Sequence, residues 1–192
     1  MSKVQLGPQT LAYPMPAFLV GATVDDKPNF MAVAWGGISN HVPPMISVAV
    51  RHQRHTNKGI KQNKTFSVNI PSVEMVRETD YCGIASGAKV DKVKTCGFKV
   101  FYGKLKTAPM VEQCPLNLEC SLAQVIDLGT HDLIVGKIEE TYVSEGCLTD
   151  GKPDAVKINP LIYTPGDTPH YRALGDFVDR AFSVGKELKE KE

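Results

Sequence analysis

Short β-type runs that follow one another closely constrain the fold of this 192-residue chain more than any other feature. Residues 17–35 contain two apolar runs separated by the turn sequence DDKPN, and residues 45–51 form a third run, MISVAVR. β-rich runs bounded by Gly, Pro, Asn and Asp are typical of strands. The first two runs therefore predict a hairpin with a five-residue loop at residues 25–29.

A longer β pair is predicted in the second half of the chain. Residues 116–128 alternate between apolar and polar side chains, and residues 131–143 follow across the Gly129-Thr130 turn. Six or more strands without regular βαβ alternation favour a mainly β fold with flanking helices, an antiparallel barrel, over a doubly wound sheet.

Few helices are predicted. Thr56 can cap a short helix over residues 57–63, residues 72–86 have helical spacing, and a further helix is expected over residues 176–188. At this length one domain is the default, so we expect a single domain over residues 1–192.

Composition excludes several classes of protein. Lys and Arg total 22 against 21 acidic residues, which gives a net charge of +1. The overall charge therefore does not indicate binding to nucleic acid or to an acidic membrane. Neither a signal-peptide core nor an apolar run of membrane-spanning length occurs, which favours a cytoplasmic protein. The five cysteines form no C-x-x-C pair, which argues against a disulfide framework and against a metal site.

A basic corner follows the third run and contains Arg51, His55, Thr56 and Lys58. Guanidinium, ammonium and hydroxyl groups beside a helix N-terminus are suitable donors for a phosphate. On composition alone, a solvated basic loop is the stronger interpretation. The spacing of His52 and His55 brings no carboxylate or cysteine to ligand distance, so we expect no metal there.

The strand FMAVAW suits a flat ligand. Ala32 and Ala34 allow close backbone approach, and the amides of Asn29 and Asn69 can complete hydrogen bonding to a polar ring edge. The alternative is a buried strand of a packed core, which this pattern alone favours. Trp35 either walls the ligand or fills the barrel.

The loop ASGAKVDK carries Ser86, Lys89 and Lys92, and its glycine allows backbone N–H groups to converge on a phosphate. It is neither a P-loop nor a G-x-G-x-x-G motif, so a Rossmann domain is disfavoured. His131 sits at a turn; it is either structural or a proton donor near a flavin. Cys82 is interpreted as a small buried hydrophobe.

Several segments together resemble the flavin reductase-like, FMN-binding split-barrel family, and in particular its flavoredoxin-like branch. The motifs, in order, are PNFMAVAWGG, PPMISVAVR with HTNKGI, FSVNIPS, YCGIASGAKVDK, THDLIVGKI and LIYTPGDTPHYRALGDFVDRAFSVGK. They extend over nearly the whole chain.

The resemblance implies a six-stranded antiparallel Greek-key split barrel that forms a homodimer and binds FMN. It implies one site for the flavin ring, one site for the phosphate, and a histidine, His131, near the reactive face of the flavin. The implied cofactor residues, with His55 from the basic corner, are Asn29, Met31, Ala32, Val33, Ala34, Trp35, Val50, Arg51, His55, Thr56, Asn69, Ser86 and Lys92.

The function expected from this resemblance is two-electron redox chemistry at bound FMN, with NAD(P)H as the donor. Two alternatives remain open. The first is an electron carrier of the flavoredoxin type, with a redox partner protein and no nicotinamide activity. The second is a non-catalytic ligand-binding barrel. Trp35 stands where many relatives have a small or hydroxyl residue. A bulky indole at this position would narrow the access of a nicotinamide, so it affects reductase activity more than FMN binding.

Overall fold

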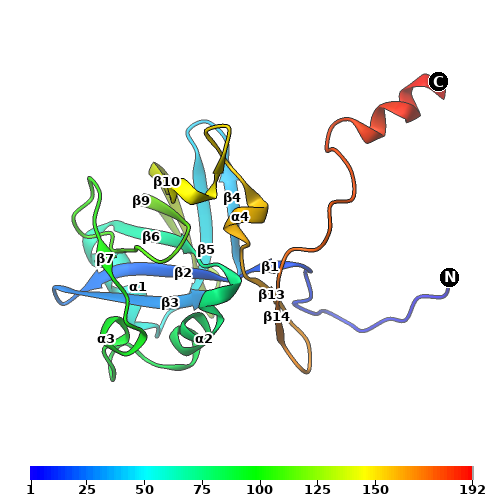
Figure 1. Ribbon diagram of the computed structural model, residues 1–192. Coiled ribbons are helices and arrows are strands. Elements are labelled where there is room, and N and C mark those ends of the chain that lie inside the picture. The colour runs from blue at the N-terminus through cyan, green and yellow to red at the C-terminus, as the bar shows by residue number, and fades with distance from the viewer. Residues whose placement is uncertain (192) are drawn as a thin grey trace.

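The computed structural model describes residues 1–191, and its centre is a strongly curved antiparallel sheet (Figure 1). The order of strands is not sequential, because β2 lies beside β6 and β10 lies beside β5, as in a Greek key. The strands in sheet order are β3 (Lys27–Val33), β2 (Phe18–Val24), β6 (Thr65–Ile70), β9 (Leu116–Asp127), β10 (His131–Val143), β5 (Met45–Arg51) and β4 (Gly36–Asn40).

The sheet closes into a barrel because β3 and β4 follow each other with only two residues between them. β3 pairs with β2 at one end of the sheet, and β4 pairs with β5 at the other. The amide of Ala49 donates to the carbonyl of Trp35 at 2.8 Å and extends the pairing of β4 with β5 into the link that leads back to β3. The expected antiparallel barrel is confirmed; the strand count is seven rather than six when β3 and β4 are counted separately.

Smaller elements surround the barrel. The helices are α1 (His55–Asn63), α2 (Val76–Ile84), α3 (Lys92–Cys96) and α4 (Ala155–Ile158), with 3-10 turns η1 (Val73–Met75), η2 (Glu145–Cys147) and η3 (Val184–Lys191). The short strands are β1 (Met15–Pro16), β13 (Ile162–Thr164) and β14 (His170–Arg172) in one sheet, β7 (Val100–Phe101) with β8 (Met110–Val111), and β11 (Leu148–Thr149) with β12 (Lys152–Pro153).

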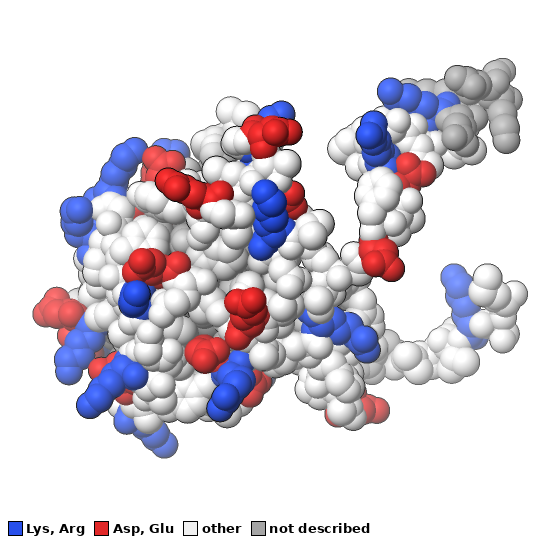
Figure 2. Space-filling model, in the orientation of Figure 1, with Lys and Arg blue, Asp and Glu red and all other residues white. Residues whose placement is uncertain are grey.

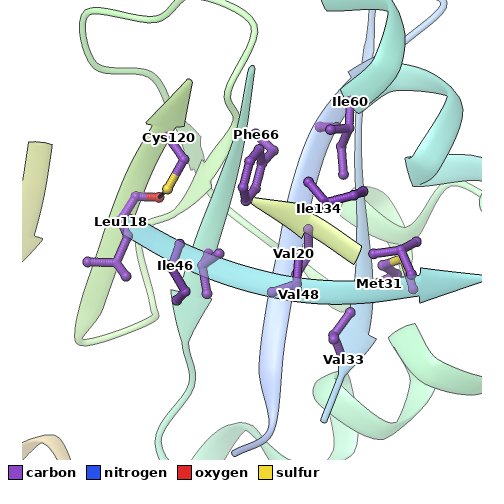
Figure 3. Packing of buried hydrophobic residues seen from close by; sticks show 13 residues of the cluster. Val20, Met31, Val33, Ile46, Val48, Ile60, Phe66, Leu118, Cys120 and Ile134 are labelled. Atoms are coloured by element: carbon purple, nitrogen blue, oxygen red, sulfur yellow. Dashed lines mark hydrogen bonds between the residues drawn. The ribbon is translucent and has the colours of Figure 1, made fainter. Parts of the chain in front are cut away.

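The main core fills the barrel. Figure 3 shows side chains from the surrounding strands pointing inward, with Phe66, Ile134 and Val48 among those fully buried. A second cluster around Phe30 and Phe98 lies under α2 and α3. Of the helices in the described part of the chain, none is both long and apolar enough to cross a membrane.

The first hairpin is tighter than expected. β2 and β3 pair Val24 with Lys27, so the loop is two residues long instead of five. Asp25 and Asp26 have φ of 48° and 61°, which is the left-handed geometry of a two-residue hairpin turn. The apolar pattern begins only at Phe30. The prediction from this pattern therefore assigned the start of β3, which is paired with β2 and faces solvent, to the loop.

Two helix predictions need correction. α1 begins at His55 with Arg54 at its N-cap, and Thr56 is buried inside the first turn. Residues 173–183 contain no α-helix, and η3 covers only the end of the predicted helix over 176–188. A helix of that length is marginal without a packed face, because most helical stability in proteins comes from tertiary packing. The long pair of β9 with β10 and the helical segment after Ser72 agree with prediction.

Candidate functional site

Three segments enclose a cavity of about 260 Å³, which we call the basic cavity. They are the middle of β3, the connection from β5 into α1, and the loop between α2 and α3. The predicted site residues that line it are Asn29, Met31, Arg51, His55, Thr56, Ser86 and Lys92. Residues from three separate sequence motifs therefore meet at one place.

The start of α1 faces this cavity because β5 ends in a tight turn. The carbonyl of Arg51 accepts hydrogen bonds from the amide of Arg54 at 3.1 Å and from the Asn57 side chain at 3.3 Å. The Arg51 side chain stays exposed at the strand end. Gly59 lets α1 lie close to β2, since a Cβ there would be 2.3 Å from the Thr23 carbonyl oxygen. The unpaired N–H groups of the first turn of α1 add positive partial charge.

Asn29 and Thr56 form the buried floor of the basic cavity. Asn29 Nδ2 donates to Thr56 Oγ1 at 2.7 Å, which leaves the Thr56 hydroxyl proton available to a ligand. Gly87 packs against the same amide, because a Cβ on Gly87 would lie 1.9 Å from Asn29 Oδ1. The loop after α2 can therefore approach β3 only with glycine at this position.

Lys92 supplies a buried ammonium group. Its side chain reaches under α2 and donates to the carbonyls of Phe30 and Cys82, both at 2.8 Å. Burial lowers the pKa of Lys92, because the charged form loses water. An ammonium has three donors, so one remains for an anion in the cavity.

A second cavity, of about 210 Å³, adjoins the first, and we call it the aromatic cavity. Met31, Arg51 and Arg54 line both cavities. The other predicted residues that line it are Ala32, Val33, Ala34, Trp35 and His131. Each cavity alone is smaller than the roughly 300 Å³ of typical ligand pockets, whereas the joined pair reaches that range.

Trp35 and His131 stack at the edge of the aromatic cavity. Their ring centroids are 4.9 Å apart with an interplanar angle of 36°. His131 opens β10 directly opposite Arg51 of β5. Trp35 is 41% exposed, so the indole walls the cavity and does not fill the barrel.

The surroundings of His131 favour the neutral form of its imidazole. Burial lowers the pKa of His131, and the charges of Arg51 and His52 lower it further. Its Nδ1 lies 2.9 Å from Thr130 Oγ1, which orients the ring. A neutral imidazole can donate one hydrogen bond and accept another at neutral pH.

Two predicted site residues lie elsewhere. Val50 is fully buried in the barrel core, because side chains alternate along β5, and Ala49 lines the aromatic cavity instead. Asn69 is also fully buried, and its amide bonds to Leu19, Ser67, Val111 and Asn117. Their side chains hold the barrel together and do not reach either cavity.

Sequence reasoning missed several lining residues. Gln53 and Arg54 stand between two predicted residues, and Ala85 and Gly87 flank Ser86, so local proximity could have found them. Arg54 also joins α1 to α2, since its guanidinium donates to the Gly83 carbonyl at 3.1 Å. Tyr163 of β13 lines the aromatic cavity from far along the chain, and no local signal marks it.

Cys82 is buried beneath the site, as expected for a small apolar residue. Burial raises the pKa of Cys82 to about 12, so the thiol is protonated at neutral pH. All five cysteines are free.

The sequence pattern of the flavin reductase like domain matches residues 10–172. The chain belongs to this family. A crystal structure of flavoredoxin from Methanosarcina acetivorans is 44% identical, covers 98% of this chain and 100% of its own, and superposes with a TM-score of 0.93. Flavoredoxin of Desulfovibrio vulgaris (Miyazaki F) is 40% identical, covers 96% of this chain and 100% of its own, and has a TM-score of 0.90.

A more distant solved structure has the same fold. An FMN-binding protein from Thermus thermophilus is 25% identical, covers 93% of this chain and 99% of its own, and has a TM-score of 0.77. The expected split barrel and the expected flavoredoxin-like branch of the flavin reductase-like family are confirmed.

Proposed function

We propose that this flavoprotein binds FMN across the two joined cavities and is an NAD(P)H-dependent flavin oxidoreductase. The observation that carries the proposal is the juxtaposition of a cationic, hydroxyl-lined cavity with a cavity lined by alanines and aromatic side chains. FMN has the matching two ends, a phosphate and a planar ring. When bound, FMN supplies the two-electron redox chemistry, and the protein supplies binding, orientation and electrostatics.

The basic cavity fits the phosphate by the chemistry of its donors. Arg51 offers a planar fork of N–H groups, Lys92 offers a desolvated ammonium, and Thr56 offers a hydroxyl. Ser86 and the first turn of α1 contribute further donors.

The aromatic cavity fits the ring system. The small side chains of Ala32, Ala34 and Ala49 in its lining leave room for a ring and for backbone groups to approach the polar ring edge. The neutral His131 imidazole stands at its rim, where it can exchange a proton with a reacting group or orient a nicotinamide.

One observation favours the second candidate, an electron carrier that works with a redox partner protein and without nicotinamide activity. The Trp35 indole stacks on His131 at the edge where a nicotinamide would enter.

The free thiols of the described chain agree with a reducing compartment, and we place the protein in the cytoplasm.

The test is a visible spectrum of the purified protein, identification of the heat-released pigment, and then anaerobic mixing with NADH and with NADPH. Flavin bands and released FMN are expected, followed by bleaching within a turnover time. Persistent oxidised bands with both nucleotides would assign the carrier role. A colourless protein that leaves added FMN fluorescence unquenched would refute flavin binding altogether.

A further inference from the structure

Tyr163 lines the aromatic cavity from β13, a strand of the small sheet that is separate from the barrel. The hydroxyls of Tyr13 and Tyr171 are hydrogen-bonded within the protein, whereas that of Tyr163 has no partner among the described residues. A buried or half-buried phenol usually has a hydrogen-bond partner. The Tyr163 hydroxyl is therefore available to a ligand in the aromatic cavity.

The hairpin of β13 and β14 places Tyr163 beside the barrel. Tyr163 pairs with Met15 of β1 on one side and with Tyr171 of β14 on the other, and Figure 1 shows the hairpin next to β1. Figure 2 shows this part of the surface as largely uncharged, whereas both signs of charge are interspersed over the body of the protein. None of the ion pairs in the described chain involves the hairpin. Uncharged contacts and hydrogen bonds must therefore hold it in place.

One hydrogen bond joins the hairpin to α2. The Tyr171 hydroxyl donates to Asp80 Oδ1 at 3.0 Å, although the two residues are 91 positions apart in the sequence. The rings of Tyr171 and Tyr163 pack edge to face, with centroids 5.9 Å apart and an interplanar angle of 60°. Burial raises the pKa of Tyr171, and the Asp80 carboxylate raises it further, so the phenol remains a donor at neutral pH. Asp80 thus holds Tyr171, and Tyr171 supports the ring of Tyr163.

The same part of α2 also holds two cations of the site. The Cys82 carbonyl accepts a hydrogen bond from Lys92 at 2.8 Å, and the Gly83 carbonyl accepts one from Arg54 at 3.1 Å. Lys92 lines the basic cavity, and Arg54 lines both cavities. Within four residues, α2 therefore supports groups around the whole site, and Asp80 is the residue of this stretch that acts on the hairpin.

We propose that the Tyr163 hydroxyl donates a hydrogen bond to the polar edge of the flavin ring, and that Tyr171 and Asp80 are positioning residues for it. The inference rests on the proposed function, because the ring is that of FMN. The polar edge of a flavin carries carbonyl groups, and a phenol is a neutral donor to such acceptors. Neither Tyr171 nor Asp80 lines the two cavities, so the effect of both on the flavin passes through Tyr163.

The first experiment is titration of Tyr163→Phe with FMN and with riboflavin. This change removes the hydroxyl and keeps the ring, so the affinities for both flavins should fall by the same factor, about two- to tenfold. Tyr102→Phe is the matched control, because Tyr102 is 38% exposed and lines neither cavity. It should bind both flavins as the wild type does. Unchanged affinities in Tyr163→Phe, or a loss confined to FMN, would overturn the contact with the ring.

The infrared spectrum of bound FMN distinguishes a hydrogen bond from simple packing. Loss of a donor to a flavin carbonyl should move its stretching band to higher wavenumber in Tyr163→Phe and leave it in place in Tyr102→Phe. An unshifted band would overturn the hydrogen bond even if the affinity falls.

A double-mutant cycle tests the positioning role. Tyr171→Phe should weaken riboflavin binding in the wild type and have no further effect in the Tyr163→Phe protein, because the hydroxyl that it positions is already absent. Asp80→Ala should behave like Tyr171→Phe, whereas Asp80→Asn keeps an acceptor oxygen and should retain most of the affinity. Additive losses from Tyr171→Phe and Tyr163→Phe would show a general effect on folding and overturn the positioning role.

The same titrations separate this inference from the proposed function. A wild type that binds neither flavin would refute the proposed function and this contact together. A wild type that binds FMN with the same affinity as Tyr163→Phe would overturn the contact alone and leave the proposed function in place.

Discussion

Arg51 and Arg54 are the two cations that line both cavities, and Arg51 stands exposed at the end of β5. Its guanidinium can approach the phosphate and the ring from one position. We expect Arg51→Ala to lower FMN affinity at least about tenfold, because a charge-assisted hydrogen bond contributes about 1.5–3 kcal/mol. Fluorescence titration with FMN measures the change.

Arg77→Ala is the matched control, since Arg77 is exposed on α2 and lines neither cavity. It should bind FMN as the wild type does. Unchanged affinity in Arg51→Ala would remove this guanidinium from the phosphate site.

At the scale of elements, Asp132 joins β10 to α1. Its buried carboxylate accepts from Asn57 Nδ2 at 2.7 Å and pairs with Lys61 at 2.6 Å. Burial opposes ionisation, but the hydrogen bonds from Lys61 and Asn57 and the charges of Lys61 and His52 outweigh it and lower the pKa of Asp132. This contact fixes the start of α1 beside His131 and therefore supports the shape of the site.

The lowered pKa predicts a pH-dependent effect of Asp132→Asn. The stabilisation is present above the pKa of about 3.9 of an unfolded aspartate, and it is lost as pH falls through the lower folded value. The variant should lose about 1–3 kcal/mol of unfolding free energy at pH 7. Urea unfolding should show that this loss shrinks as the pH falls below the unfolded pKa of about 3.9 and on through the lower folded value.

The exposed Asp167 provides a control, and Asp167→Asn should leave the unfolding free energy unchanged at each pH. A constant loss for Asp132→Asn across the pH range would mean that packing, and not charge, is what the carboxylate contributes.

At the scale of the whole molecule, the proposed FMN site links β3, the start of α1 and the loop before α3. A ligand that binds only the folded state stabilises it by about 2.7 kcal/mol at a hundredfold excess over its dissociation constant. Removal of FMN should therefore lower the thermal unfolding midpoint by about 5–10 °C, which scanning calorimetry measures.

Riboflavin, which lacks the phosphate, should restore only part of the lost midpoint. Full restoration by riboflavin would argue against a phosphate in the basic cavity. An identical midpoint with and without FMN would argue against binding to the folded state.

Local sequence was sufficient to predict site residues where neighbours in the chain are also neighbours in space. Arg51, His55 and Thr56 lie within one turn between a strand and a helix, and they meet at the basic cavity as expected. The alternation of β5 also determined which side chains face inward, and it would have favoured Ala49 over Val50 as a lining residue. Ser86 and Lys92 came from resemblance, because their glycine-containing loop alone is a weak signal.

The sequence by itself determined the β-rich fold, the basic corner and the small-residue strand, because strand alternation and turn chemistry act over a few residues. Only the tertiary structure decided that Trp35 stacks on His131, that Tyr163 lines the aromatic cavity, and that Asn69 belongs to the core. These contacts join residues far apart in the chain. They depend on barrel closure and strand register, and short-range patterns carry no information about either.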